Sequence, residues 1–140
     1  MSHPTPAAHE FLHPKSWKPA IGYSNGVAAR GRMVFTGGII GWDADQTITS
    51  DDFATQAATA LQNIVDILAC AGARPDHLVR LTWYVTDKQA YLGSLKTLGQ
   101  HYKSIIGRHY PAMALVQVVA LVEDRAMVEI EATAVIPEGM

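Results

Sequence analysis

The stretch RHYPAMALVQVVALVEDRAMVEIEATAVI, residues 108–136, decides the fold. Apolar and β-branched residues dominate its two arms, and charged residues cluster at 123–125 between them, which predicts two strands at 112–121 and 126–136. Apart from Gln117, the first arm is apolar on both faces. A strand of this kind must be covered on both sides.

The second arm alternates in character, as expected of a strand with one buried face. One face carries Val128, Ile130, Ala132 and Ala134, and the other carries Met127, Glu129, Glu131 and Thr133. Two carboxylates therefore share a face of the predicted sheet.

Length and composition predict one domain with a substantial core, because the chain has 140 residues and is 49% hydrophobic. The net charge of −2 gives no polybasic face, so we do not expect a nucleic-acid partner. No apolar run approaches the roughly 20 residues of a membrane span, and the first residues lack the pattern of a signal peptide. Cys70 is the only cysteine, and we interpret it as a packed thiol. These features predict a cytoplasmic protein without a membrane partner.

Residues 1–18 are rich in Pro, His and Ala and show no periodicity, which predicts a flexible N-terminal tail or an arm laid over a neighbour. The domain itself is expected at 19–137. Neither His3, His9 and His13 nor the acidic pair Asp43 and Asp45 has metal-ligand spacing, so we expect solvated histidines, a turn at the acidic pair and no metal site.

The middle of the chain alternates strands and helices. Strands are predicted at 23–28 and 33–37, as an antiparallel pair around Gly31, and at 78–85. Apolar residues spaced by three or four predict helices from Phe53 to Ala71 and from Asp87 to Gly107.

Each helix is a crossover between parallel strands, and right-handed crossovers place both helices on one face of a mixed α+β sheet. The other face is left bare, although burying each apolar side chain is worth about 1.5–3 kcal/mol. We therefore expect a homo-oligomer packed through this face, with Arg80, Tyr84, Glu129 and Glu131 at or near subunit boundaries.

The chain resembles the RidA (YjgF) family, also labelled L-PSP endoribonuclease-like, over almost all of 19–137. The matching pieces are IGY (21–23), VFTGG (34–38), Gln56, Asn63, VRLTWYVTD (79–87), Tyr91, Pro111 with Ala112, and VEIEA (128–132). Their order and spacing together carry the resemblance. It implies a chorismate-mutase-like subunit of the bacillus type, assembled as a homotrimer with a small-molecule ligand in each inter-subunit cleft.

The resemblance also implies an activity, the hydrolysis of reactive enamines and imines such as 2-aminoacrylate to a 2-keto acid and ammonia, without a cofactor. In deaminating members an arginine follows the Pro-Ala pair and binds the substrate carboxylate. Here that residue is Met113, the family's cysteine two positions later is Leu115, and the asparagine expected early in the second helix is Leu95. This change predicts a larger or more apolar ligand. Alternatively, Met113 and Leu115 fill the trimer core.

Other positions keep the family's residues. Glu129 is the candidate catalytic residue, because its carboxylate could orient water. The remaining candidate ligand-binding residues are Tyr23, Thr36, Gly37, Tyr84 and Tyr91.

Arg108 is a further ligand-binding candidate, because it could supply the missing positive charge from a displaced position. The alternative is that it complements the helix C-terminus. We interpret Glu131 as structural and paired with Arg80, and Trp83 as a core or interface aromatic.

Three functions are compatible with this pattern. The first is hydrolytic deamination of an enamine or imine that is not a small, carboxylate-anchored amino-acid derivative. The second is non-catalytic binding of an aromatic or apolar small molecule. An endoribonuclease ranks last, since the sequence lacks a paired-histidine arrangement and an evident basic groove.

Overall fold

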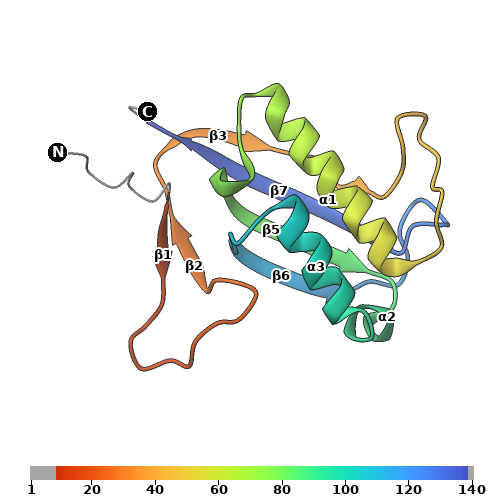
Figure 1. The fold of residues 1–140 in the computed structure, drawn as a ribbon, viewed down its shortest axis with the longest axis horizontal. Helices are drawn as coiled ribbons and strands as arrows, with labels where there is room; N and C mark the ends of the chain where they lie inside the picture. The colour runs from red at the N-terminus through yellow and green to blue at the C-terminus, as the bar shows by residue number, and fades with distance from the viewer. Residues whose placement is uncertain (1–8, 139–140) are drawn as a thin grey trace.

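The computed structural model describes residues 9–138. Its main sheet is mixed and has two main helices on one face (Figure 1). The strands are β1 (Glu10–Leu12), β2 (Gly26–Ala28), β3 (Gly31–Phe35), β4 (Ile39–Ile40), β5 (Leu78–Val85), β6 (Ala112–Gln117) and β7 (Val128–Pro137). The helices are α1 (Phe53–Cys70), the 3₁₀ turn Pro75–His77, α2 (Lys88–Leu92) and α3 (Leu95–Ile105). The predicted α+β architecture, with a mixed sheet and two helices on one face, is confirmed.

The main sheet has the strand order β3-β7-β5-β6, and β4 also pairs with β7. β5 and β6 are parallel, and β7 is antiparallel to β3, β4 and β5. The chain returns from β5 to β6 through α2 and α3, so the predicted helical crossover joins two neighbouring strands. β1 and β2 form a separate two-stranded sheet.

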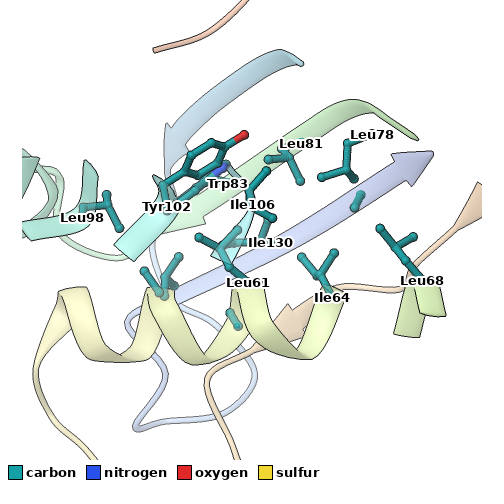
Figure 2. Packing of buried hydrophobic residues seen from close by; sticks show 14 of the residues in the cluster. Leu61, Ile64, Leu68, Leu78, Leu81, Trp83, Leu98, Tyr102, Ile106 and Ile130 are labelled. Carbon is teal, nitrogen blue, oxygen red and sulfur yellow. The ribbon is translucent and has the colours of Figure 1, made fainter. Parts of the chain in front are cut away.

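The core lies between α1, α3 and the sheet. α1 begins where the Asp52 carboxylate accepts the Thr55 N–H at 3.0 Å, which is a side-chain N-cap. Leu61, Ile64 and Leu68, at helical spacing, are fully buried and face sheet residues (Figure 2). The alternation predicted for β7 is also confirmed, since Val128, Ile130, Ala132 and Ala134 are all buried.

Both strands predicted in residues 108–136 are present, as β6 and β7. β6 and β7 are not neighbours, because β5 lies between them. β6 also ends at Gln117 rather than at 121, after which the Val118 N–H donates to the Val85 carbonyl at 2.8 Å. β6 is an edge strand, so the residues that follow have no second partner strand in the described chain, and Val119 and Val122 are fully exposed. The cover expected on both faces of this arm is present only on its helix side.

The predicted antiparallel pair around Gly31 is wrong. β2 pairs with β1, and β3 pairs with β7. Gly31 has a φ of 150° and packs against the Ile136 carbonyl, where a Cβ atom would collide. The glycine therefore allows close approach of β7 instead of forming a hairpin turn.

Two further expectations need correction. The second predicted helix is divided at Gly93 and Ser94 into α2, capped by Asp87 through the Gln89 N–H at 2.9 Å, and α3. Cys70 is exposed rather than packed, because it lies at the last position of α1, outside the buried stripe.

The segment 9–18 contains a strand that was not predicted, while residues 1–8, including His3, lie outside the described residues. The strand pairs with β2, and side chains around it also contact His77 and His109. His9 is buried and its Nε2 donates to the His77 carbonyl at 2.8 Å. Phe11 packs edge-on against the His109 ring at 5.6 Å.

No helix within residues 9–138 is long and apolar enough to cross a membrane. In the same part of the chain, no group of three His, Cys, Asp or Glu side chains could hold a metal ion. The Asp43 carboxylate accepts the N–H groups of Asp45 and Thr47 at 2.9 and 3.0 Å, which confirms the predicted turn.

The two histidines under β1 make stability depend on pH. Burial lowers the pKa of His77 and His109 below the ordinary value of 6.5, so the unfolded chain binds protons that the folded chain resists. The contribution of the two neutral histidines to the free energy of unfolding is fully present above pH 6.5. It is lost as the pH falls through the pKa values that His77 and His109 have in the folded protein. We expect urea midpoints to fall between about pH 7.5 and about pH 5, before carboxylates titrate.

His109→Gln provides the test, because a glutamine amide can still donate to the Leu78 carbonyl that His109 Nε2 contacts at 2.7 Å. This variant should flatten the pH dependence. His101→Gln is the control, since His101 makes no side-chain hydrogen bond to residues 9–138. If the urea midpoint changes equally with pH in the natural protein and in both variants, the pH dependence does not come from His109.

Candidate functional site

A pocket of about 530 Å³ opens between α3, the helix side of β5 and β6, and the segment before β2. It is lined by Ile21, Gly22, Tyr23, Trp83, Tyr91, Leu95, Leu98, Gly99, Tyr102, Tyr110, Met113 and Leu115. No charged side chain is among them. The pocket is therefore lined by aromatic and apolar side chains, whose polar groups are tyrosine hydroxyls and the Trp83 indole N–H.

Strand register explains how β6 contributes to this lining. Met113 lies opposite Leu81 and Leu115 lies opposite Trp83 in the parallel pair. Side chains alternate along a strand, so Met113 and Leu115 share the helix-facing side with Trp83. Met113 and Leu115 therefore lie side by side in one pocket wall.

Tyr23 reaches the pocket because the next residue is tied to the start of β6. The Ser24 N–H donates to the Pro111 carbonyl at 3.1 Å, and its hydroxyl donates to the Tyr110 carbonyl. Tyr23 is itself about half exposed, which places it at the mouth of the pocket.

Aromatic residues form the floor and one wall. Tyr102 and Tyr110 stack with centroids 5.4 Å apart, and the Tyr102 hydroxyl donates to the His109 carbonyl at 2.6 Å. Burial raises the pKa of Tyr102 far above its ordinary value, so this phenol stays protonated. Trp83 is only 3% exposed, and its indole N–H has no partner within residues 9–138 (Figure 2 shows the ring beside Tyr102).

Glu129 lies on the opposite face of the sheet. It pairs in register with Tyr84, which in turn lies opposite Val116, and none of the three faces the helices. The Glu129 carboxylate packs against Gly38, where an added Cβ would come within 2.5 Å of Oε2. It makes no side-chain hydrogen bond to residues 9–138, so both oxygens are free to bind water.

Glu131 is two residues further along β7, on the same face. It accepts a hydrogen bond from the Tyr84 hydroxyl at 2.9 Å, which raises the pKa of Tyr84. The partner of Glu131 is therefore Tyr84 and not the expected Arg80. Thr82 lies directly opposite Glu131, and Tyr84 reaches it diagonally from the neighbouring strand.

Thr36 and Gly37 follow β3 near the same face. The Thr36 hydroxyl accepts the Ala132 N–H at 2.9 Å and donates to the Gly37 carbonyl at 2.8 Å. Gly37 is exposed, with no atom within 4 Å of the place that a Cβ would occupy. Its backbone is consequently open to a ligand.

The ten candidate residues thus fall into two groups and one outlier. Tyr23, Tyr91, Leu95, Met113 and Leu115 line the pocket. Thr36, Gly37, Tyr84 and Glu129 lie on or beside the open sheet face. Arg108 is exposed and does not line the pocket, so the structure does not bring it to the place of the missing arginine.

Seven pocket residues were not among the candidates: Ile21, Gly22, Trp83, Leu98, Gly99, Tyr102 and Tyr110. Trp83 was interpreted as a core or interface aromatic, and Tyr102 and Tyr110 were not weighed as ligand contacts. The position of Tyr110 directly before the Pro-Ala pair was the available signal. Only the parallel pairing of β5 with β6 brings Trp83 to the same wall.

The family model described as "Endoribonuclease L-PSP" matches residues 14–136. A protein of Salmonella typhimurium named 2-iminobutanoate/2-iminopropanoate deaminase is 34% identical over 83% of this chain and 89% of its own. The chain belongs to the RidA (YjgF) family. Protein DfrA of Myxococcus xanthus is 34% identical to this RidA family member, over 91% of this chain and 96% of DfrA.

A solved structure of the same family supports the fold. YyfB of Yersinia pestis, titled a protein of unknown function of the conserved Rid family, has a TM-score of 0.83 at 28% identity. The match covers 92% of this RidA family chain and 99% of YyfB.

The two stacked tyrosines give a direct test of the pocket wall. Tyr102→Phe should lower the free energy of unfolding by about 1 kcal/mol, because it removes one hydrogen bond and leaves the His109 carbonyl unpaired. Tyr110→Phe is the matched control, since the Tyr110 hydroxyl makes no hydrogen bond to residues 9–138. Urea denaturation measures both, and equal effects would contradict the described geometry.

Proposed function

We propose that this protein hydrolyses a reactive imine or enamine that carries no carboxylate beside the reacting carbon. The proposal rests on one observation, the uncharged pocket lining in which Met113 follows Pro111 and Ala112. Methionine has neither the charge nor the donors that bind a carboxylate. The Salmonella relative is named a deaminase of 2-imino acids, which supports the class of reaction but not the same substrate.

The proposed active form is a homotrimer, with the substrate in a cleft between subunits. The pocket and Glu129 lie on opposite faces of one sheet, so a single subunit does not present both to one ligand. The open face also exposes Met33 and Phe35, at 57% and 65%, beside the carboxylate row. Burying such side chains is worth about 1.5–3 kcal/mol each, which favours a second copy on this face.

In the proposed reaction, water adds to the carbon of the C=N group and the C–N bond then breaks. Glu129 carries one proton from the attacking water to the nitrogen, which gives a carbinolamine, and then carries the hydroxyl proton of the carbinolamine to the same nitrogen. The C–N bond breaks, ammonia leaves and a carbonyl compound remains. The carboxylate is suited to this because residues 9–138 donate no hydrogen bond to it. Tyr23, at the pocket mouth, supplies the phenol that contacts the nitrogen.

The alternative is a binding protein that uses the same pocket without turnover. The observation that favours it is that Leu95, Met113 and Leu115, which line the pocket together, are all apolar. A wall of this kind binds apolar or aromatic molecules but supplies no group for proton transfer.

A rate measurement separates the two functions. Phenylacetaldehyde imine, which has no carboxylate, and 2-aminoacrylate are generated freshly, and loss of each and release of ammonia are followed with and without protein. We expect acceleration for the carboxylate-free imine only. Glu129→Gln should lower kcat by about a hundredfold or more, the range of general acid–base catalysis.

Two further variants make the result specific. Glu131→Gln is the matched control, because Glu131 is occupied by Tyr84, and it should keep most of the activity. Gly38→Ala should lower kcat, because its Cβ would displace the Glu129 carboxylate. Ligand-dependent stabilisation without any acceleration would favour the binding protein.

A further inference from the structure

The pocket does not end at α3. A second hollow of about 600 Å³ lies along the outer side of this helix and shares Leu95, Gly99 and Tyr110 with the pocket lining. The remaining residues around the second hollow are Lys96, Gln100, Lys103 and Ser104. One groove therefore runs from an uncharged aromatic interior across the helix to a polar, basic exterior.

Gly99 is the residue over which the two hollows join. It lies inside α3, where glycine is less favourable than alanine. Packing does not require it, because an added Cβ would meet no heavy atom within 4 Å. Because Gly99 has no side chain, nothing protrudes from α3 at the place where the two hollows meet. Gly99 is unfavourable in a helix and is not required by packing, and we interpret it as keeping a passage open for a ligand.

Lys96 and Lys103 stand on the same stripe of α3 as Gly99, since the spacings are three and four residues. The helix sequence LKTLGQHYKSI contains no acidic residue. Both lysines are exposed, and neither forms an ion pair within residues 9–138. Their positive charges are thus uncompensated at the outer end of the groove.

We propose that the ligand of this pocket is an amphipathic anion, with an aromatic or apolar body in the pocket and a carboxylate held by Lys96 and Lys103 beyond Gly99. The inference deepens the proposed function, because it uses the same pocket as the substrate site. The positive charge absent at Met113 has moved outward, to the far side of α3, and Arg108 does not replace it. The substrate class is an imine or enamine whose carboxylate is several bonds from the C=N carbon.

Charge complementarity argues for this ligand over a neutral one. The pocket lining supplies apolar contact but no ionic anchor, and the outer hollow supplies two ammonium groups without apolar walls other than Leu95 and Tyr110. A neutral aromatic molecule would use the interior only. A small dicarboxylate would have to leave water for an uncharged interior, which is unfavourable.

Isothermal titration with phenylbutyrate and its uncharged amide, phenylbutyramide, tests the inference on the full chain. We expect the anion to bind the natural protein more tightly than the amide. The double variant Lys96→Gln with Lys103→Gln should weaken phenylbutyrate binding by about tenfold and leave phenylbutyramide binding within about twofold, because only the anion forms charge-assisted hydrogen bonds. Lys88→Gln, an exposed lysine on α2, is the charge-matched control and should change neither affinity.

Gly99→Leu tests the passage itself. Leucine favours a helix more than glycine, so the melting temperature should not fall, while the preference for the anion over the amide should disappear. Equal affinity of the natural protein for phenylbutyrate and phenylbutyramide would overturn the inference. So would an unchanged preference in the double lysine variant.

The two proposals fail in different ways. If lysine-dependent binding is found but no imine is hydrolysed faster than in buffer, the ligand class stands and the proposed deaminase activity is wrong. If phenylacetaldehyde imine is hydrolysed, but the double lysine variant leaves phenylbutyrate affinity unchanged, the deaminase activity stands and the amphipathic ligand is wrong.

Discussion

The double pairing of β5 is the constraint on which the rest of the structure depends. β5 is antiparallel to β7 on one side and parallel to β6 on the other. The register of these two pairings decides which side chains of the three strands face the same side of the sheet. The crossover through α2 and α3 packs on the same face as α1, so helices cover one face of these strands and leave the other open (Figure 1). Every outward side chain is left for water or for another subunit. Register therefore assigns each residue to one of two chemical environments.

This division explains why the candidate residues do not form one site within a subunit. Trp83 and Leu115 face the helices, whereas Tyr84 and Glu129, one position away along β5 and β7, face outward. No side-chain rearrangement within the chain exchanges the two faces, since a strand would have to slip by one residue. The combination of an apolar pocket with a free carboxylate is consequently a property of the assembly we propose.

The uncharged pocket wall is the feature on which the proposed function depends. Leu95, Met113 and Leu115 give this wall apolar side chains without charge. Met113 and Leu115 lie on the helix-facing side of β6, whereas Leu95 begins α3 and is half exposed. In the function that we propose, this wall does not bind a carboxylate, and the proposed ionic anchor lies at Lys96 and Lys103 instead.

The sequence by itself determined the elements and their faces. The stripe of α1, the alternation of β7 and the family resemblance all depend on residues close together in the chain, where the period is directly visible. The tertiary structure decided which strands pair, since β2 pairs with β1 instead of β3 and β6 pairs with β5. It also decided that Glu131 bonds to Tyr84 instead of Arg80. Strand partners are chosen by long-range packing and hydrogen bonding among many similar apolar edges, and a local pattern does not distinguish one such edge from another.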